Sequence, residues 1–331
     1  MSENAPTSDT DSQPSAEPLH PQPPTPIEPA KKKEGSELRA RLLTALILIP
    51  SVLYLIVLGG LPYLVAVVVI IVLGQYEIYE LLRDKGAHPS MRFGLVAGGA
   101  LPVVMYLGNE YHATVMITAT LLATMVLELR RQRINEAMAS ISGTFFGIFY
   151  VGWLLAHAVV LRNFEGAVRH NHGIQAVEQL GLSPESGIFF MVYVLVVVVL
   201  CDTGAYFAGR RYGRRKLAPA ISPGKSVEGA VGGIVAGVAG GCMAKAFFDA
   251  FYPEMSSTLG WSAAAGFGVI LSIIGIIGDL VESLLKRDAQ VKDAGRLLPG
   301  MGGVLDRIDA PLLAIPVMYY LLLFYMVPGV A

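Results

Sequence analysis

The stretch GDLVESLLKRDAQVKDAGRLLPGMGGVLDRID, residues 278–309, is a polar, charge-dense segment between two strongly apolar ones. Paired acids can hold a divalent cation, and neighbouring cations suit a triphosphate, so the segment indicates phosphoryl chemistry. A solvated cytoplasmic loop that follows the positive-inside rule is the alternative. The Pro-Gly-x-Gly-Gly turn at residues 299–303 and the spacing of the acids favour a site over that alternative. The charged residues are Asp279, Glu282, Asp288, Asp293, Asp306, Asp309, Lys286, Arg287, Lys292, Arg296 and Arg307.

The composition is that of an integral membrane protein. The 331 residues are 53% hydrophobic and only 15% charged, and the mean hydropathy is +0.55. Soluble globular proteins carry about 25% charged residues, so the chain is expected to lie in a bilayer. The net charge of −1 does not by itself indicate a class of partner. We expect no nucleic-acid partner. The two cysteines both fall in apolar segments and indicate no disulfide framework.

The apolar segments predict an all-α, polytopic membrane protein with about nine transmembrane helices. A helix needs about 20 mostly apolar residues to cross a bilayer. The apolar runs are too long for strands and do not alternate, so no strands are expected. Glu77 and Tyr79, near the end of the second span, could contact substrate or another helix. The predicted spans are 42–60, 63–82, 93–108, 112–129, 141–161, 187–207, 228–249, 262–281 and 310–328.

The amino-terminal region differs from the rest of the chain. Residues 1–40 are predicted to be a disordered, Pro-rich cytoplasmic tail, because they contain too few large apolar side chains to offset the cost of ordering. Residues 41–331 are predicted to form the membrane-embedded domain. Most of the 25 Lys and Arg fall on one side of the membrane if the amino terminus lies inside. We therefore expect the charged loops and the active site to face the cytoplasm. Because the chain is short and has a single domain, the expected membrane is a bacterial inner membrane.

A second charged loop runs from residue 202 to residue 233. Asp202 and Tyr206 are four residues apart and share a helix face. An aspartate at this depth has either a site role or an ion pair with a neighbouring arginine. Ser222-Pro223 predicts a helix start, which would place Lys225 by the positive end of that helix, a natural place for a phosphate. Glycines at four-residue spacing follow, at 229, 233, 237 and 241, and predict close packing against another helix.

The spacing within residues 278–309 predicts a metal site. Asp279, Glu282, Ser283 and Lys286 fall on one helix face. The glycines at 300, 302 and 303 allow the chain to reverse and bring Asp306 back towards Asp279. Two carboxylates from different helices would then hold a divalent metal with open positions for phosphate oxygens.

These residues resemble the phosphatidate cytidylyltransferase family. The resemblance covers about residues 45–328, and the second charged loop is similar to the family's other cytoplasmic segment. It implies synthesis of CDP-diacylglycerol from CTP and phosphatidic acid, an all-helical membrane fold, and a metal centre at Asp279 and Asp306. The matching pattern consists of Ser283, Lys286-Arg287, Lys292-Asp293, Gly295, Pro299-Gly300, Gly302-Gly303, Asp306-Arg307 and Asp309.

The chain departs from the family pattern at two places. Met301 stands where the family commonly has His, and Gly224-Lys225-Ser226-Val227 replaces Lys-Lys-Thr-Trp. Methionine cannot transfer a proton, so any role of that His is lost or taken over by another residue.

The residues and the resemblance together predict the site. Mg²⁺ is expected on Asp279 and Asp306, with a second cation left open. The expected partners are CTP, phosphatidic acid and the lipid bilayer, and a homodimer is left open. The predicted catalytic residues are Asp279, Lys286, Arg287, Lys292, Asp306 and Arg307. The predicted substrate-binding residues are Asp202, Ser222, Lys225, Glu228, Ser283, Gly302 and Gly303.

Two other functions fit parts of the pattern. A CTP-dependent lipid-alcohol kinase would use the same groups to transfer the γ-phosphoryl group. A transporter is suggested by the glycine-rich helices, but transporters place their polar groups near the bilayer midplane. In this chain the charges cluster at the predicted cytoplasmic ends of the helices, which favours an enzyme.

Overall fold

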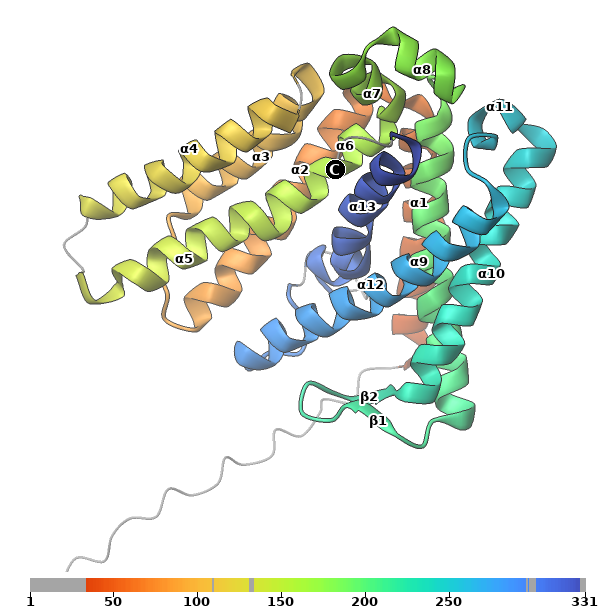
Figure 1. Cartoon of the computed structure of the whole chain (residues 1–331). Helices are drawn as coiled ribbons and strands as arrows, with labels where there is room; N and C mark the ends of the chain where they lie inside the picture. Colours follow the sequence, from red (N-terminus) through yellow and green to blue (C-terminus); the bar gives the residue numbers. More distant parts are fainter. Residues whose placement is uncertain (1–33, 109, 131–133, 296, 298–301, 328–331) are drawn as a thin grey trace, which may run out of the picture.

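The computed structural model describes residues 34–108, 110–130, 134–295, 297 and 302–327. These residues are almost entirely helical, as predicted, and their elements are drawn in Figure 1. The elements are α1 (Glu34–Leu58), α2 (Gly60–Asp84), α3 (Met91–Leu107), α4 (Glu110–Leu129), η1 (Ile134–Glu136), α5 (Ala137–Gly147), η2 (Ile148–Trp153), α6 (Leu154–Arg162), α7 (Phe164–His172), α8 (Ile174–Leu180), α9 (Ser186–Tyr212), β1 (Lys216–Ala218), β2 (Ser222–Ser226), α10 (Val227–Phe251), α11 (Pro253–Ser256), α12 (Trp261–Asp288) and α13 (Leu305–Met326).

Seven helical segments among the described residues are long and apolar enough to cross a membrane, so the predicted count of about nine is not confirmed. The predicted spans at 42–60 and 93–108 correspond to shorter apolar helices, Leu46–Leu58 and Met91–Leu107. A helix of 17 residues such as α3 is about 25 Å long, less than the roughly 30 Å of a hydrocarbon core. Helix α1 begins at Glu34, within the predicted tail, and residues 1–33 lie outside the described part.

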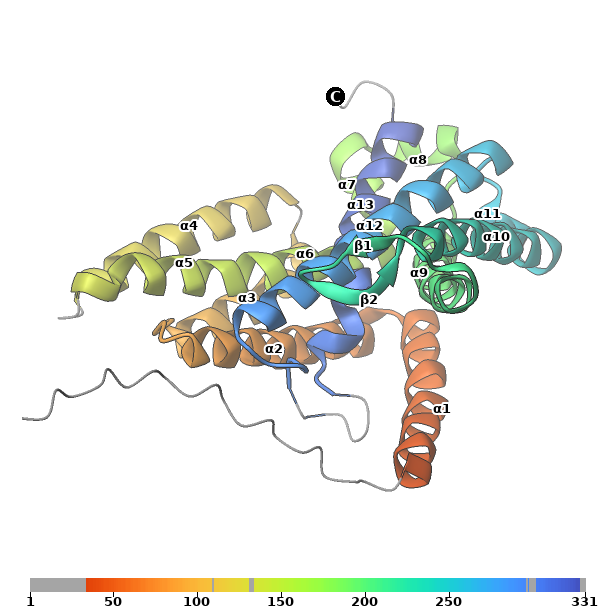
Figure 2. The ribbon, with the colours of Figure 1, turned by 90° about the horizontal axis from the view of Figure 1, so that it is seen from below.

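The helices surround α13, which contacts α2, α6, α9 and α12. Its buried Tyr319 packs edge-on against Phe164, with ring centroids 5.9 Å apart, and Phe164 packs in the same way against Phe190 at 5.4 Å. Seen from below in Figure 2, the start of α13 lies beside α2. The centre of the bundle therefore fixes the helix that carries Asp306 and Asp309.

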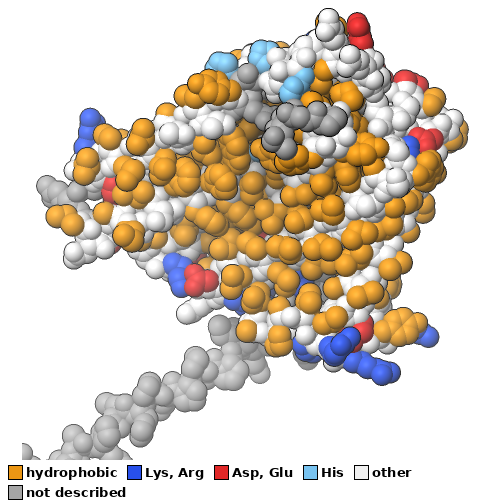
Figure 3. All heavy atoms as spheres, in the orientation of Figure 1, with side chains coloured by type: hydrophobic (Ala, Val, Ile, Leu, Met, Phe, Trp, Pro, Cys, Tyr) orange, Lys and Arg blue, Asp and Glu red, His pale blue; other side chains and the backbone are white. Residues whose placement is uncertain are grey.

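Apolar side chains cover the sides of the molecule, and Lys and Arg side chains concentrate at one end. Figure 3 shows a broad hydrophobic surface with cations concentrated around the β1–β2 hairpin at the lower end. At the same end, the Lys85 ammonium lies 2.8 Å from the Asp288 carboxylate and joins the end of α2 to the end of α12. This distribution agrees with a membrane-embedded body whose cation-rich end is exposed to water.

The hairpin corrects two expectations. Strands β1 and β2 pair antiparallel, although no strands were expected. Ser222-Pro223 does not start a helix, because these residues lie in β2 and α10 begins at Val227. The Val227 N–H instead donates to the Arg215 carbonyl at 2.9 Å, and the Ser226 hydroxyl caps the helix by accepting the Gly229 N–H at 3.1 Å. Because α10 begins at Val227, later than predicted, Lys225 lies two residues before the start of the helix.

The glycine series on α10 packs against α9, as predicted. A Cβ atom at Gly229 would lie 2.9 Å from the Ala205 carbonyl oxygen, and one at Gly233 would lie 2.8 Å from that of Cys201. One turn further, a Cβ at Gly237 would lie 3.1 Å from the Val197 carbonyl oxygen. The glycines therefore let two helix backbones meet at a distance that no larger residue permits.

We expect Gly233→Ala to destabilise the protein by about 1–3 kcal/mol, because the added methyl group must push α9 and α10 apart. Thermal unfolding in detergent, monitored by circular dichroism, measures the change.

Gly266→Ala on α12 is the matched control. Beyond the backbone of α12 itself and the two chain neighbours, no atom of the described residues lies within 4 Å of a Cβ at this position, so the helix should gain up to about 1 kcal/mol from the better helix former. Equal melting temperatures for the two variants would contradict the packing role of Gly233.

Candidate active site

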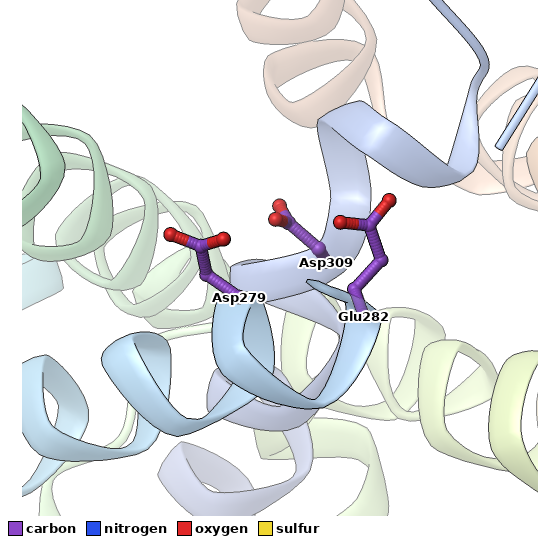
Figure 4. A group of neighbouring side chains, drawn as sticks. All are labelled: Asp279, Glu282 and Asp309. Carbon is purple, nitrogen blue, oxygen red and sulfur yellow. The ribbon is translucent and has the colours of Figure 1, made fainter. Parts of the chain in front are cut away.

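Three carboxylates from two helices form the densest group of acids in the described residues. Asp279 and Glu282 project from α12 and Asp309 projects from α13 into the same space (Figure 4). One oxygen of each lies within 4.8 Å of the others. Glu282 is buried, whereas Asp279 and Asp309 are half-buried. Like charges this close repel strongly, so the group requires a cation or protons.

A glycine brings the two helices together at this point. A Cβ atom at Gly278 would lie 2.5 Å from the Asp309 carbonyl oxygen and 3.2 Å from the Ala310 Cα. The absence of a side chain therefore lets the first turn of α13 cross directly over α12. Because Asp279 follows Gly278 and Glu282 lies one turn later, both face the crossing.

Lys286 joins the acids on α12 to Asp306 on α13. Its ammonium group lies 2.5 Å from Glu282 Oε2 and 2.8 Å from Asp306 Oδ1. Asp306 also accepts hydrogen bonds from the N–H of Ala294 at 3.0 Å and the N–H of Gly303 at 2.8 Å. Asp306 thus fixes the connection between α12 and α13 and is linked to Glu282, one of the three acids, through Lys286. The pairing of Asp279 with Asp306 on one metal stays a prediction.

The two charged loops meet at Asp279. The Lys225 ammonium, carried by β2, lies 2.6 Å from Asp279 Oδ2, and about a quarter of each side chain is exposed. The Arg287 guanidinium on α12 donates to the Ile221 carbonyl in the hairpin at 3.4 Å. The hairpin is therefore attached to α12 at two places, at Asp279 and about two turns later at Arg287.

A cavity of about 600 Å³ opens beside this ion pair, and its volume is typical of small-molecule sites. Of the predicted residues, Asp202, Ser222, Lys225 and Asp279 line it, so four sequence-predicted positions come together around one space. Residues from α9, the hairpin, α10 and α12 complete the lining: Ala205, Tyr206, Gly209, Arg210, Leu217, Gly224, Ser226, Gly229, Ala230 and Ile276.

Other predicted residues have different surroundings. Glu228 accepts hydrogen bonds from the N–H groups of Arg214 and Arg215 at 3.0 and 3.1 Å, which closes the base of the hairpin. Ser283 is half-buried on α12, and Lys292 and Arg307 are exposed.

The glycine turn is described only at its end. Gly302 has a φ of 85°, which favours glycine, and Gly303 is buried. Met301, the departure from the family's His, lies outside the described residues.

Sequence reasoning left three buried or half-buried acids out of the predicted site. Glu282 and Asp309 had a signal in their spacing, since each follows a predicted site acid by three residues. Glu77 had none: its carboxylate accepts the N–H groups of Val304 and Leu305 at 3.0 and 2.8 Å, and these residues are 227 and 228 positions away. Of the two alternatives for Glu77, the structure therefore gives contact with another helix.

The donor set fits a hard divalent cation. Asp279, Glu282 and Asp309 offer only carboxylate oxygens, the ligands that Mg²⁺ and Ca²⁺ prefer. Glu282 Oε1 is buried and has no hydrogen-bond partner among the described residues, a costly state that a bound cation would relieve. The site therefore combines a group of acids suited to a metal with lysines suited to phosphate oxygens.

Comparison with known proteins agrees with this chemistry. The model of the cytidylyltransferase family matches residues 39–325. The chain is similar to the phosphatidate cytidylyltransferase of Synechocystis, with 31% identity over 85% of this chain and 94% of that protein. It is also similar to the chloroplastic phosphatidate cytidylyltransferase 5 of Arabidopsis thaliana, with 32% identity over 86% of this chain and 71% of that protein.

The alignment with a third relative spans nearly the full length of that protein. The phosphatidate cytidylyltransferase of Bacillus subtilis is 29% identical over 87% of this chain and 99% of that protein. Since the family model spans most of the sequence and these relatives align along most of it, the chain belongs to the cytidylyltransferase family.

Proposed function

We propose that this protein transfers the cytidylyl group of CTP to phosphatidic acid, giving CDP-diacylglycerol and pyrophosphate. The observation that carries the proposal is the meeting of the Lys225 ammonium and the three acids Asp279, Glu282 and Asp309 beside a ligand-sized cavity. The relatives named above are phosphatidate cytidylyltransferases, which supports the same substrates.

Asp279, Glu282 and Asp309 would hold Mg²⁺, and the family resemblance adds Asp306 as a candidate ligand. When bound, magnesium would neutralise negative charge on the oxygens of the triphosphate and of the pyrophosphate that leaves. Lys286, paired with Glu282 and Asp306, holds these acids in place from the side of α12. A second cation remains an open part of the proposal.

Lys225 is the first candidate for contact with the triphosphate. It lies on the wall of the cavity and is paired with Asp279. If Asp279 held a cation, the Lys225 ammonium would be free to donate hydrogen bonds to phosphate oxygens. Arg287, Lys292 and Arg307 are proposed as further phosphate ligands.

The proposed nucleophile is a phosphate oxygen of phosphatidic acid. It attacks the α-phosphorus of CTP in line with the departing pyrophosphate, so one phosphorus–oxygen bond forms as another breaks. This oxygen is already anionic near neutral pH, so no strong general base is required. Replacement of the family's His by Met301 is compatible with such a reaction.

The proposed setting is a bacterial inner membrane with the site facing the cytoplasm. The gathering of cations around the hairpin supports this orientation. CTP would then enter from water, and the acyl chains of phosphatidic acid would stay among the apolar faces of the helices. A homodimer is left open.

Purified protein in detergent, given phosphatidic acid, Mg²⁺ and CTP labelled at the α-phosphate, should form a labelled lipid. We expect Asp279→Asn and Asp309→Asn each to lower the rate at least about 100-fold, because they remove carboxylates proposed to bind the metal. EDTA should abolish the reaction.

The same assay separates the alternatives. If CTP labelled at the γ-phosphate marks an added lipid alcohol and the α-label stays in CDP, the protein is the kinase. Retention of full activity by Asp309→Asn, with loss in Asp306→Asn, would replace the acid group proposed here by the Asp279–Asp306 pair.

We expect Lys225→Ala to reduce kcat/KM for CTP by about 100-fold, because a charge-assisted contact with the triphosphate is lost. Lys85→Ala is the control: it removes a lysine of the same face whose ion pair with Asp288 is exposed, and such pairs contribute little. Steady-state kinetics at saturating phosphatidic acid measures both, and equal kinetics for the two variants would exclude a role for Lys225.

A further inference from the structure

Glu77 is a buried acid far in sequence from the candidate active site. It lies on α2, and only 2% of its surface is exposed. A buried carboxylate is costly unless its oxygens are hydrogen-bonded or paired. Within the described residues Glu77 forms no ion pair, and its oxygens instead accept the N–H groups of Val304 and Leu305. Its role is therefore tied to the backbone at the start of α13.

The N-cap residue of α13 provides no side-chain cap. Val304 is the N-cap residue and supplies no side-chain acceptor. The first turn of any helix leaves N–H groups without partners, and its end carries partial positive charge. Glu77 provides acceptors for two of these groups and a negative charge at the positive end. A neighbouring helix thus performs the capping that is usually local.

Two glycines make room for this carboxylate. A Cβ atom at Gly303 would lie 2.5 Å from Glu77 Oε2, and a Cβ at Gly295 would overlap the same carboxylate. Both glycines belong to the connection between α12 and α13. The small residues at these positions are therefore explained by a side chain from α2.

We infer that Glu77 is a positioning residue that sets the location of Asp306 and Asp309 relative to the acids of α12. The hydrogen-bonded amides of Val304 and Leu305 directly precede Asp306, and Asp309 follows one turn later. These hydrogen bonds hold the start of α13 against α2. They therefore set the position of this part of α13 along its axis and its rotation about that axis, and with them the positions of Asp306 and Asp309. The effect on catalysis rests on the proposed function, whereas the structural role does not.

Glu77→Gln tests the structural role by hydrogen exchange with mass spectrometry on detergent-purified protein. The side chain keeps its size, but its amide nitrogen cannot accept a hydrogen bond. We expect faster exchange in peptides that cover Val304 and Leu305. Glu80→Gln is the matched control, since the same change on the same helix alters a side chain that is 42% exposed and paired with Arg83.

The second readout is metal affinity. We expect Glu77→Gln to bind Mn²⁺ about 10–100-fold more weakly, as measured by electron paramagnetic resonance, because groups behind metal ligands commonly have effects of this size. In the α-label assay, the Mg²⁺ concentration for half-maximal rate should rise similarly. Glu80→Gln should match the wild type in both measurements.

If Glu77→Gln does not fold, Gly303→Ala is the alternative variant for the hydrogen-exchange experiment. Its methyl group displaces the same carboxylate without removing the charge and should accelerate the same exchange. Wild-type exchange at Val304 and Leu305 together with wild-type Mn²⁺ affinity in folded Glu77→Gln would overturn the inference. Wild-type protein that transfers no label would instead refute the proposed function, and the exchange experiment would still decide the role of Glu77.

Discussion

Repulsion between Asp279, Glu282 and Asp309 is the constraint around which the charged end of the molecule is built. Two unit charges 4 Å apart interact by about 4 kcal/mol at an effective dielectric constant of 20, and these three acids have oxygens within 4.8 Å of one another. Two lysines lie against the group from different sides. Lys225 approaches from the hairpin, and Lys286 approaches from within α12.

Backbone contacts hold the acids in place despite this repulsion. Gly278 allows α13 to cross α12 beside Asp279, and the glycines of α10 hold that helix against α9. Because α9 and α10 carry the hairpin between them, their close packing also determines where Lys225 lies. Small residues within apolar helices thus decide the geometry of a charged site at their ends, where ionised groups can reach water.

The sequence was sufficient for the helical fold and the two charged loops, because these depend on apolar length and on spacing within single helices. The contact between the loops through Lys225 and Asp279 is a tertiary contact that such spacing does not specify. It was insufficient for β2, because Ser-Pro is compatible with a helix start and with an edge strand, and pairing with β1 decides between them. The grouping of Glu282 and Asp309 required the crossing angle of two helices. The contact of Glu77 with α13 is non-local and leaves no periodic signal.

The Lys225–Asp279 ion pair means that the acid group has a counter-ion within the protein itself. A metal bound at Asp279 or a triphosphate bound at Lys225, as proposed, would compete with that pair, so part of the ligand's binding energy would be used to separate the two side chains. Stability of the unliganded protein and affinity for the ligand are therefore opposed at this position. A change that strengthens the pair by a given free energy weakens ligand binding by the same amount, provided that binding requires its rupture.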